Sequence, residues 1–242
     1  MNFSADKKRA IVTGANSGIG KATALSLAQA GIDLALVGRS IDCLEEVAIA
    51  AQGQGVDVET YAFDLLQLAQ IREKFEAIAA ELGQVDVLIN NAGMGYTHSL
   101  EQTSLADWQQ VIDLNLTSSF QVTLGVLPRM RQQQQGQIIN VSSTAAKTVF
   151  PEWGAYCVSK AALNALSPAI AAEECANGIR VTTVMPGAVN TPIWDTETVD
   201  ADFDRAMMLT PENVAETILQ IVQLPASANI EEIVVTPSAG AL

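Results

Sequence analysis

Tyr156 and Lys160 stand four positions apart in an Ala-rich segment of the chain. Residues with this spacing share one face of a helix, so we expect the phenol and the ammonium one turn apart. A free phenol titrates near pH ~10, and a neighbouring positive charge lowers that pKa by favouring the phenolate. Such a tyrosine can exchange a proton close to neutral pH. Ser143 closes an apolar run thirteen residues earlier, and its hydroxyl can hydrogen-bond a reacting carbonyl oxygen.

Three glycines, Gly14, Gly18 and Gly20, separate the first apolar run from an Ala- and Leu-rich segment. We expect Gly14 to permit a tight turn, Gly18 to let the backbone approach a pyrophosphate, and Gly20 to let the helix pack closely on the sheet. The free N–H groups at a helix N-terminus favour a bound phosphate. The pattern predicts a dinucleotide site formed by Gly14, Asn16, Ser17, Gly18, Ile19 and Gly20, although its spacing differs from the common G-x-G-x-x-G.

A glycine-rich turn of this kind has two other interpretations. A nucleoside-triphosphate loop needs a glycine five residues before Gly20 and a hydroxyl after Lys21. Those positions hold Ala15 and Ala22, so no side chain there could hold a magnesium ion. A glycine-rich turn without a ligand stays open on this motif alone.

Arg39 follows the second apolar run, where no acidic residue is present to bind a ribose 2′-hydroxyl. An arginine at this place can bind a 2′-phosphate through two hydrogen bonds. The sequence therefore favours NADP over NAD, with a solvated loop charge as the alternative. Asp64, after the third run, is expected to accept from an adenine amino group or to cap the helix that follows, and Leu65 lies beside it.

Short apolar runs alternate with longer helical patterns along the whole chain. Continuous apolarity predicts strands covered on both faces, as in a parallel sheet between helices. We therefore expect one α/β domain over residues 1–242, a Rossmann fold whose doubly wound sheet has seven parallel strands and helices on both faces. The predicted strands are Arg9–Val12, Asp33–Val37, Val56–Phe63, Val85–Ile89, Gln137–Val141, Ile179–Met185 and Glu232–Val235. The predicted helices are Lys21–Ala30, Leu66–Leu82, Leu114–Gln135 and Ala155–Ala176, with further helix starts at Ser40, Ser104 and Thr210.

The composition excludes several classes of protein. The chain has 27 Asp and Glu against 13 Lys and Arg, a net charge of −14, which argues against a nucleic-acid partner. Three scattered cysteines and one histidine favour free thiols in a reducing compartment and no metal site. No apolar stretch reaches the ~18 residues of a membrane span. We expect a cytoplasmic protein without a membrane partner.

Taken together, the motifs resemble the short-chain dehydrogenase/reductase family over nearly the whole chain. They occur in the family's order: the glycine turn, Asn90–Gly93, Asn115, Ser143, Tyr156 with Lys160, and Pro186–Gly187. The resemblance implies NADP(H)-dependent interconversion of a carbonyl compound and an alcohol by hydride transfer. It also implies a homodimer or homotetramer formed through the two long helices.

The resemblance implies a role for each matching residue. Tyr156 would be the general acid, Ser143 would polarise the carbonyl, and Lys160 would lower the pKa of Tyr156 and bind ribose hydroxyls. Asn115 would hold a water in a proton relay behind Lys160. Further cofactor contacts would come from Asn90, Asn91, Ala92, Gly93, Pro186, Gly187, Val189 and Thr191.

The substrate side is predicted less closely. Thr144, Phe150, Trp153 and Trp194 are expected to line the pocket, with Met94, Tyr96 and Ala188 nearby. Residues 187–209 form a long, irregular and acidic segment that we interpret as a substrate lid. The acidity disfavours a strongly anionic substrate unless Lys147 reaches in.

The C-terminal quarter is similar to the family's NADP-dependent 3-hydroxy acid dehydrogenases, yet no arginine stands out to bind a carboxylate. An alternative function is a non-catalytic NADP-binding redox sensor or scaffold protein. Such proteins usually lose the tyrosine or the lysine, and both are present here.

Overall fold

Seven parallel strands form one sheet in a computed structural model that describes residues 7–201 and 204–238. Their order across the sheet is β3-β2-β1-β4-β5-β6-β7, which confirms the predicted doubly wound Rossmann fold. The strands are β1 (Arg9–Thr13), β2 (Asp33–Gly38), β3 (Val58–Ala62), β4 (Val87–Asn90), β5 (Gly136–Val141), β6 (Ile179–Pro186) and β7 (Glu232–Val235).

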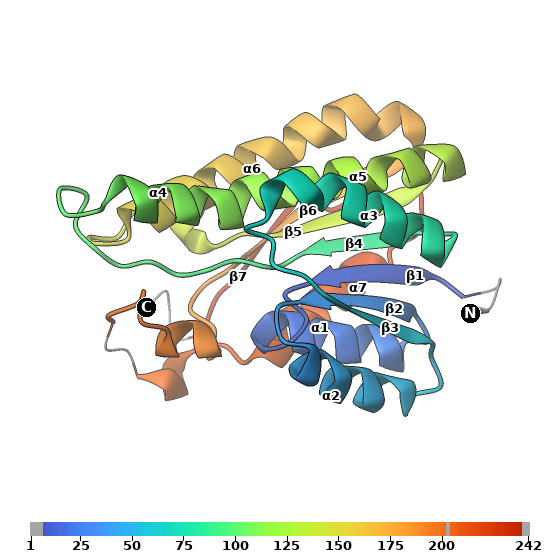
Figure 1. Ribbon diagram of the computed structural model, residues 1–242, viewed down its shortest axis with the longest axis horizontal. Coiled ribbons are helices and arrows are strands. Elements are labelled where there is room, and N and C mark those ends of the chain that lie inside the picture. Colours follow the sequence, from blue (N-terminus) through green and yellow to red (C-terminus); the bar gives the residue numbers. More distant parts are fainter. Residues whose placement is uncertain (1–6, 202–203, 239–242) are drawn as a thin grey trace.

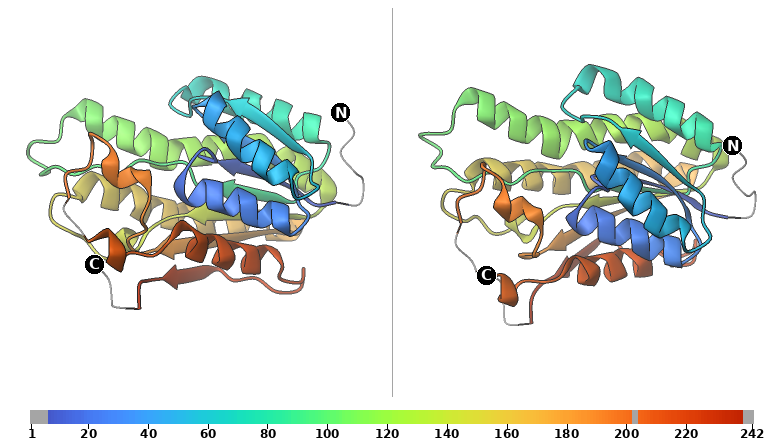
Figure 2. Two further views of the ribbon diagram at one scale, coloured as in Figure 1. Left: turned by 90° about the horizontal axis from the view of Figure 1, so that it is seen from below. Right: turned by 60° about the horizontal axis from the view of Figure 1, so that its bottom comes forward.

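Helices cover both faces of this sheet (Figures 1 and 2). On one face lie α1 (Gly18–Gln29), α2 (Ile41–Gln52) and α7 (Pro211–Val222). On the other lie α3 (Leu68–Leu82), α5 (Ser118–Gln133) and α6 (Gly154–Glu174), with α4 (Leu105–Ile112) leading into α5. Each face carries its own aliphatic core, and all five residues of β1 are buried between the two, which explains the uninterrupted apolar runs in the sequence.

Local capping signals place several helix ends. Ser40 and Ser104 accept hydrogen bonds from the backbone of α2 and α4, as their residue types predict. Thr210 forms a capping box with Asn213, with Pro211 in the first turn of α7. Gly83 ends α3 in the left-handed conformation, with φ 73°.

The long predicted helix Leu114–Gln135 is wrong at its start. The chain is helical from Leu105, and a π-helical turn over Asp113–Thr117 separates α4 from α5. The sequence pattern shows only the polar residues Asp113 and Asn115 interrupting apolar ones, which does not reveal a widened turn. The second long helix was predicted well: α6 ends at Glu174, and a short 3₁₀ turn continues to Asn177.

The carboxyl ends of the strands meet at one edge of the sheet, because all seven strands are parallel. The strand order reverses beside β1, whose two neighbours are β2 and β4, and ligands of such sheets bind in the crevice at this point. Within residues 7–201 and 204–238, no helix has the length and apolarity needed to cross a membrane, and no cluster of metal-ligating side chains occurs.

Candidate active site

The glycine turn between β1 and α1 has the predicted backbone. Gly14 has φ +64°, a conformation that side chains disfavour. A Cβ on Gly20 would lie only 2.2 Å from the Gly14 carbonyl oxygen, so only glycine lets α1 begin this close to the turn. The predicted reasons for Gly14 and Gly20 are both met by this geometry.

Thr13 and Asn91 join the carboxyl ends of β1 and β4. The Thr13 hydroxyl accepts from the backbone N–H of Asn91 at 3.0 Å and of Ala92 at 3.1 Å, and it donates to the Ile89 carbonyl at 3.2 Å. The Asn91 amide donates back to the Thr13 carbonyl at 3.0 Å. Sequence reasoning missed the role of Thr13; its signal was a hydroxyl at the end of a buried strand. The pair fixes the floor of the crevice.

The N-terminus of α1 fits a phosphate group. Ser17 is the residue that precedes the helix, yet its side chain makes no capping hydrogen bond, and the first turn carries no acidic residue. The helix therefore presents its N-terminal N–H groups and positive dipole end. Ile19 packs partly buried against the core, and the Asn16 amide lies over Gly38, where a Cβ would be 2.6 Å from its Oδ1.

Arg39 and Asp64 line one cavity of about 500 Å³ at the ends of β2 and β3. This is where the sequence predicted the adenosine part of the cofactor. Asp64 Oδ1 accepts from the Leu66 N–H at 3.0 Å, and α3 begins only at Leu68. Asp64 thus closes a turn, and the helix-capping alternative is wrong. Leu65 is buried beside it.

Ser143, Tyr156 and Lys160 come together at the end of β5 and the start of α6. Ser143 interacts with the Tyr156 side chain in a way that lowers the pKa of the phenol. The Lys160 ammonium lies 5.8 Å from the centre of the Tyr156 ring, and it donates to the Val141 carbonyl at 3.0 Å. The predicted helical spacing therefore places the three groups in one cluster.

Burial shifts the pKa values of both ionisable groups in this cluster. Burial raises the pKa of Tyr156 to about 12, and the interaction with Ser143 only partly offsets it. Burial also lowers the pKa of Lys160 to about 8. In the cofactor-free protein burial has the largest effect on the pKa of Tyr156 and keeps the phenol protonated at neutral pH. The lowering expected from Lys160 together with a positive nicotinamide ring stays a prediction.

Asn115 lies in the π-helical turn and is fully buried. Its Oδ1 accepts from the Met94 N–H at 2.8 Å, and its Nδ2 donates to the Met94 carbonyl and the Ser159 hydroxyl, each at 3.0 Å. A Cβ on Gly93 would lie 3.1 Å from Asn115 Oδ1 and 3.5 Å from Lys160 Nζ. The side chain thus braces the loop after β4 against α6, with Lys160 beside it.

Asn90 belongs to the core, which corrects its expected role as a cofactor contact. It is 2 % exposed, and its amide donates to Thr123 Oγ1 at 3.1 Å and Asn140 Oδ1 at 2.9 Å. Asn140 in turn donates to the Ser167 hydroxyl at 2.8 Å. This network ties β4 and β5 to the helices above them.

The segment after β6 returns over the glycine turn. A Cβ on Gly18 would lie 3.1 Å from Thr191 Cγ2, and Val189 pairs with Leu209 in an isolated bridge. Pro186 ends β6, and the Gly187 N–H donates to the Val235 carbonyl at 2.8 Å. The predicted cofactor contacts Pro186, Gly187, Val189 and Thr191 therefore lie on one path from the end of β6 to the glycine turn.

Trp153 lies beside Tyr156, and Trp194 packs against Trp153. The Trp153 ring centre lies 5.3 Å from that of Tyr156 and 5.7 Å from that of Trp194, edge to face in both pairs. Trp153 and Trp194 are thus brought together as predicted. Thr144 begins the turn that follows Ser143, and Phe150 lies in the loop before α6, where its carbonyl accepts from the Trp153 N–H.

Tyr96 belongs to a small core rather than to the expected pocket, and the alternative in which Lys147 reaches into the pocket does not hold. Tyr96 is 7 % exposed and packs in a small core cluster with Val111 and Ala155. Lys147 does not reach in, because its ammonium pairs with Glu232 at 2.6 Å on the exposed surface.

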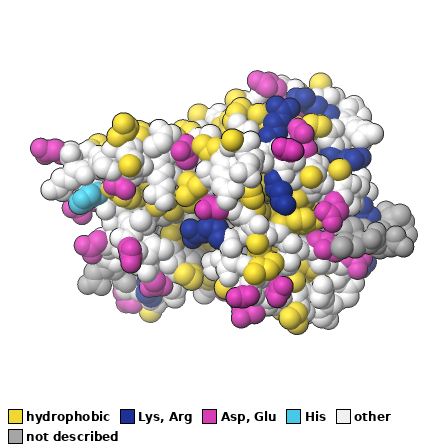
Figure 3. All heavy atoms as spheres, in the orientation of Figure 1, with side chains coloured by type: hydrophobic (Ala, Val, Ile, Leu, Met, Phe, Trp, Pro, Cys, Tyr) yellow, Lys and Arg dark blue, Asp and Glu magenta, His cyan; other side chains and the backbone are white. Residues whose placement is uncertain are grey.

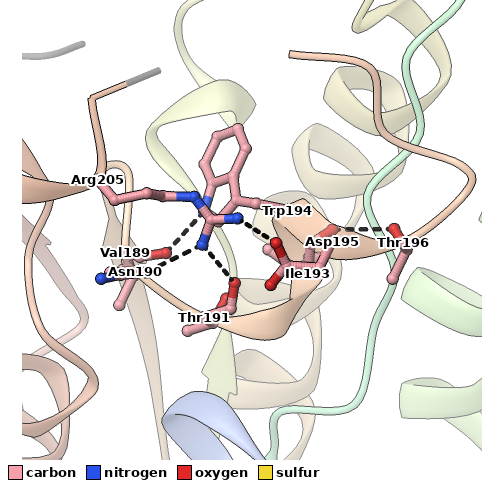
Figure 4. A network of polar contacts seen from close by, with 8 residues as sticks. All are labelled: Val189, Asn190, Thr191, Ile193, Trp194, Asp195, Thr196 and Arg205. Carbon is pink, nitrogen blue, oxygen red and sulfur yellow. Dashed lines mark hydrogen bonds and ion pairs between the residues drawn. The ribbon is translucent and has the colours of Figure 1, made fainter. Parts of the chain in front are cut away.

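Sequence reasoning also missed Arg205, which joins the two ends of the 187–209 segment (Figure 4). It donates to Asn190 Oδ1 at 2.9 Å, to the Thr191 carbonyl at 3.2 Å and to Asp195 Oδ1 at 2.7 Å. Of the residues expected in this segment, Asp202 and Phe203 lie outside the described residues.

The crevice, the glycine turn and the Ser–Tyr–Lys cluster define a Rossmann-fold protein of the dinucleotide-binding class. Residues 8–202 match the family model of short chain dehydrogenases. The chain is 33 % identical over 231 residues to an uncharacterized oxidoreductase of Staphylococcus saprophyticus, covering 95 % of this chain and 97 % of that one. The chain therefore belongs to the short-chain dehydrogenase family and is an oxidoreductase.

Solved structures with the same fold are similar along their whole length. An alcohol dehydrogenase from Thermococcus sibiricus, complexed with 5-hydroxy-NADP, has a TM-score of 0.89 and 28 % identity, covering 98 % of this chain and 99 % of that one. An acetoin dehydrogenase from Salmonella typhimurium has a TM-score of 0.86 and 30 % identity, covering 96 % and 95 %. Both confirm that the chain has the fold of this family.

Proposed function

We propose that this chain is an NADP(H)-dependent oxidoreductase that interconverts a carbonyl compound and a primary or secondary alcohol. The observation that supports it most is the cluster of Ser143, Tyr156 and Lys160 at the carboxyl edge of the sheet. Membership of the family does not by itself establish catalysis. A non-catalytic NADP-binding sensor could have the same fold and lack this cluster.

In the proposed reduction, Ser143 and Tyr156 both hydrogen-bond the substrate's carbonyl oxygen. A reduced nicotinamide cofactor, when bound, supplies the hydride. Tyr156, protonated at neutral pH because burial raises its pKa to about 12, gives its proton to the developing alkoxide. Ser143 stabilises the charge on the same oxygen. Lys160 binds ribose hydroxyls, and Asn115 orders the loop and the relay behind it.

The cofactor contacts follow the crevice from end to end. Gly14, Asn16, Ser17, Gly18, Ile19 and Gly20 would hold the pyrophosphate, which the N-terminus of α1 suits. Asn91, Ala92 and Gly93 would support the ribose, and Pro186, Gly187, Val189 and Thr191 the nicotinamide end. Arg39 in the adenosine cavity favours NADP, because a guanidinium matches a 2′-phosphate. The bound 5-hydroxy-NADP of the Thermococcus relative supports this choice.

The substrate pocket is proposed to lie between Tyr156 and the lid formed by residues 187–209, lined by Thr144, Phe150, Trp153 and Trp194. A small substrate suits these side chains, and the similarity to an acetoin dehydrogenase supports a small carbonyl compound.

We also propose a homodimer or homotetramer formed through α5 and α6. Both helices carry a large apolar side chain that is more than a third exposed: Phe120 on α5 is 39 % exposed and Val158 on α6 is 46 % exposed. A cytoplasmic location is consistent with three cysteines that are all free.

The test compares NADPH oxidation by wild type and Tyr156→Phe across aldehydes, ketones and oxo esters. We expect turnover of at least one carbonyl, with kcat reduced at least about a hundredfold in the variant, as loss of a general acid predicts. Tyr61→Phe on β3, far from the cluster, is the matched control and should keep wild-type kcat. NADPH binding without turnover of any carbonyl would favour the sensor function.

A further inference from the structure

Arg205 is the only lysine or arginine in the segment 187–209. Its guanidinium joins three parts of that segment through Asn190, Thr191 and Asp195. It also lies 6.0 Å from the centre of the Trp194 ring. Figure 4 shows the side chain reaching across to Trp194 and the backbone around it.

Three of the five N–H groups of Arg205 are therefore engaged within the protein. Nη1 contacts Asn190 and Thr191, and Nη2 contacts Asp195. Lys147 is engaged as well, by Glu232, and Lys160 lies beneath Tyr156 with its hydrogen bond to Val141. Each of these three cations is thus held by groups of the protein itself.

Trp194 is held from two sides. Its indole N–H donates to the Val189 carbonyl at 2.7 Å, and Arg205 lies over its ring. The ring then meets Trp153, which meets Tyr156. A continuous series of contacts thus leads from Arg205 through two indoles to the phenol.

The surroundings of this series are acidic. Asp195, Glu197, Asp200 and Asp204 are exposed in the same segment, and Asp195 alone pairs with Arg205. Figure 3 shows Asp and Glu side chains at the end of the molecule that carries this segment, while Lys and Arg gather mainly over the other half. An anion approaching this segment would therefore be repelled by like charges.

We propose that Arg205 is a positioning residue that holds Trp194 as a wall of the substrate pocket, and that the pocket so built takes carbonyl compounds without a carboxylate. This inference rests on the proposed function and names its substrate class. It departs from the similarity of the C-terminal quarter to hydroxy-acid dehydrogenases, because the arginine that could bind an acid fixes an indole instead.

The substrate class is tested with matched esters and acids. Wild type is assayed with NADPH on ethyl acetoacetate against acetoacetate, and on methyl levulinate against levulinate. We expect each ester to exceed its acid in kcat/KM by more than about tenfold, because a carboxylate would be desolvated without a partner. Equal or higher kcat/KM for the acids overturns the proposal, as does reduction of other carbonyls with neither ester reduced.

The role of Arg205 is tested with Arg205→Met, Trp194→Phe and the double variant. If Arg205 acts through Trp194, Arg205→Met raises the ester KM about tenfold with a smaller change in kcat. In the Trp194→Phe background the same substitution should then change KM less than about twofold. Arg72→Met, on the exposed side of α3, is the control and should leave both constants unchanged.

A merely structural role would lower the melting temperature and leave the ester-to-acid ratio unchanged, so both are measured for each variant. Loss of acid reduction alone in Arg205→Met would mean that Arg205 binds the carboxylate directly, which overturns the proposal. Additive effects of the two single substitutions would do the same. If wild type binds NADPH but reduces no carbonyl at all, the proposed function fails instead, which separates the two failures.

Discussion

The ammonium of Lys160 lies 5.8 Å from the centre of the Tyr156 ring, and its 3.0 Å hydrogen bond goes to the Val141 carbonyl. Lys160 is buried and Tyr156 is half-buried. Removal from water shifts both groups towards their neutral forms: the pKa of Tyr156 rises to about 12 and that of Lys160 falls to about 8. Two predictions depend on this pairing.

The phenol of Tyr156 should stay protonated in the cofactor-free protein as the pH rises through ~10, the pKa of a free tyrosine. Phenolate absorbance is measured as the difference between wild type and Tyr156→Phe. Adding NADP⁺ should lower this pKa, since a positive ring next to the phenol favours the phenolate. If phenolate absorbance from Tyr156 appears below pH ~10 without cofactor, burial does not raise the pKa of this phenol.

Lys160 should make the stability of the protein depend on pH in the alkaline range. Its folded pKa is lowered to about 8 from 10.5, so the unfolded state holds the proton more tightly. The free energy of unfolding of wild type relative to Lys160→Met should therefore rise between these pH values, by up to about 3 kcal/mol. Below pH 8 the buried Lys160 ammonium destabilises the folded protein to its full extent, and above pH 10.5 this destabilisation is gone. Chemical denaturation measures both proteins across this range. If the difference between their free energies of unfolding does not change with pH, the prediction is refuted.

Glu174→Gln should destabilise the protein by about 2 kcal/mol at neutral pH. This is less than the loss of a fully buried ion pair would cost, because Arg131 is half exposed to solvent. Glu174 is 1 % exposed, and Arg131 and Asn177 bond its carboxylate, each with one contact at 2.9 Å. The bond from Arg131 lowers the pKa of Glu174. The stabilisation is therefore present above pH 4.5 and lost as the pH falls through the lowered pKa.

The matched control is Glu76→Gln, which breaks the exposed pair of Glu76 and Arg72 within α3. We expect it to cost no more than about 0.5 kcal/mol. Equal effects of the two substitutions in urea denaturation would show that the buried pair contributes nothing beyond a surface pair.

Arg39→Ala should raise the Kd for NADPH at least about tenfold, the loss expected for a charge-assisted hydrogen bond to phosphate. The Kd for NADH should change little, because that cofactor lacks the 2′-phosphate. Cofactor fluorescence measures both, with Arg72→Ala as the control. An equal loss of affinity for the two cofactors would show that Arg39 does not bind the 2′-phosphate.

Gly20→Ala should destabilise the protein by about 2 kcal/mol through overpacking, because the new Cβ would meet the Gly14 carbonyl oxygen at 2.2 Å. Gly53→Ala is the control: Gly53 has φ −59° and its Cβ would be 3.3 Å from the nearest atom. It should be neutral or stabilising by about 0.5 kcal/mol. Thermal unfolding of the two variants distinguishes packing at the turn from a general intolerance of alanine.

The sequence predicted the central strands because a strand buried on both faces needs an unbroken apolar run, as in β1. The edge strand β7, Glu232–Val235, was also predicted to the residue, although its residues are exposed or half-buried. The proximity of Tyr156 and Lys160 was predicted because the two residues are close in sequence on one helix. The contact between Arg205 and Trp194 was not predicted. The two residues are eleven positions apart in an irregular segment, and such a segment has no structural repeat from which contacts could be predicted. The pKa shifts were missed for a related reason: burial is set by distant segments packing over the site.

The π-helical turn at Asp113–Thr117 has a consequence for the relative rotation of the helices on either side of it. One residue of an α-helix corresponds to a rotation of ~100° about the helix axis. Deleting a single residue from this turn would regularise the helix and swing α4 around by about that angle relative to α5. Val111, now fully enclosed, would then face a different neighbour, and the amide of Asn115 would lose its alignment with the Met94 backbone.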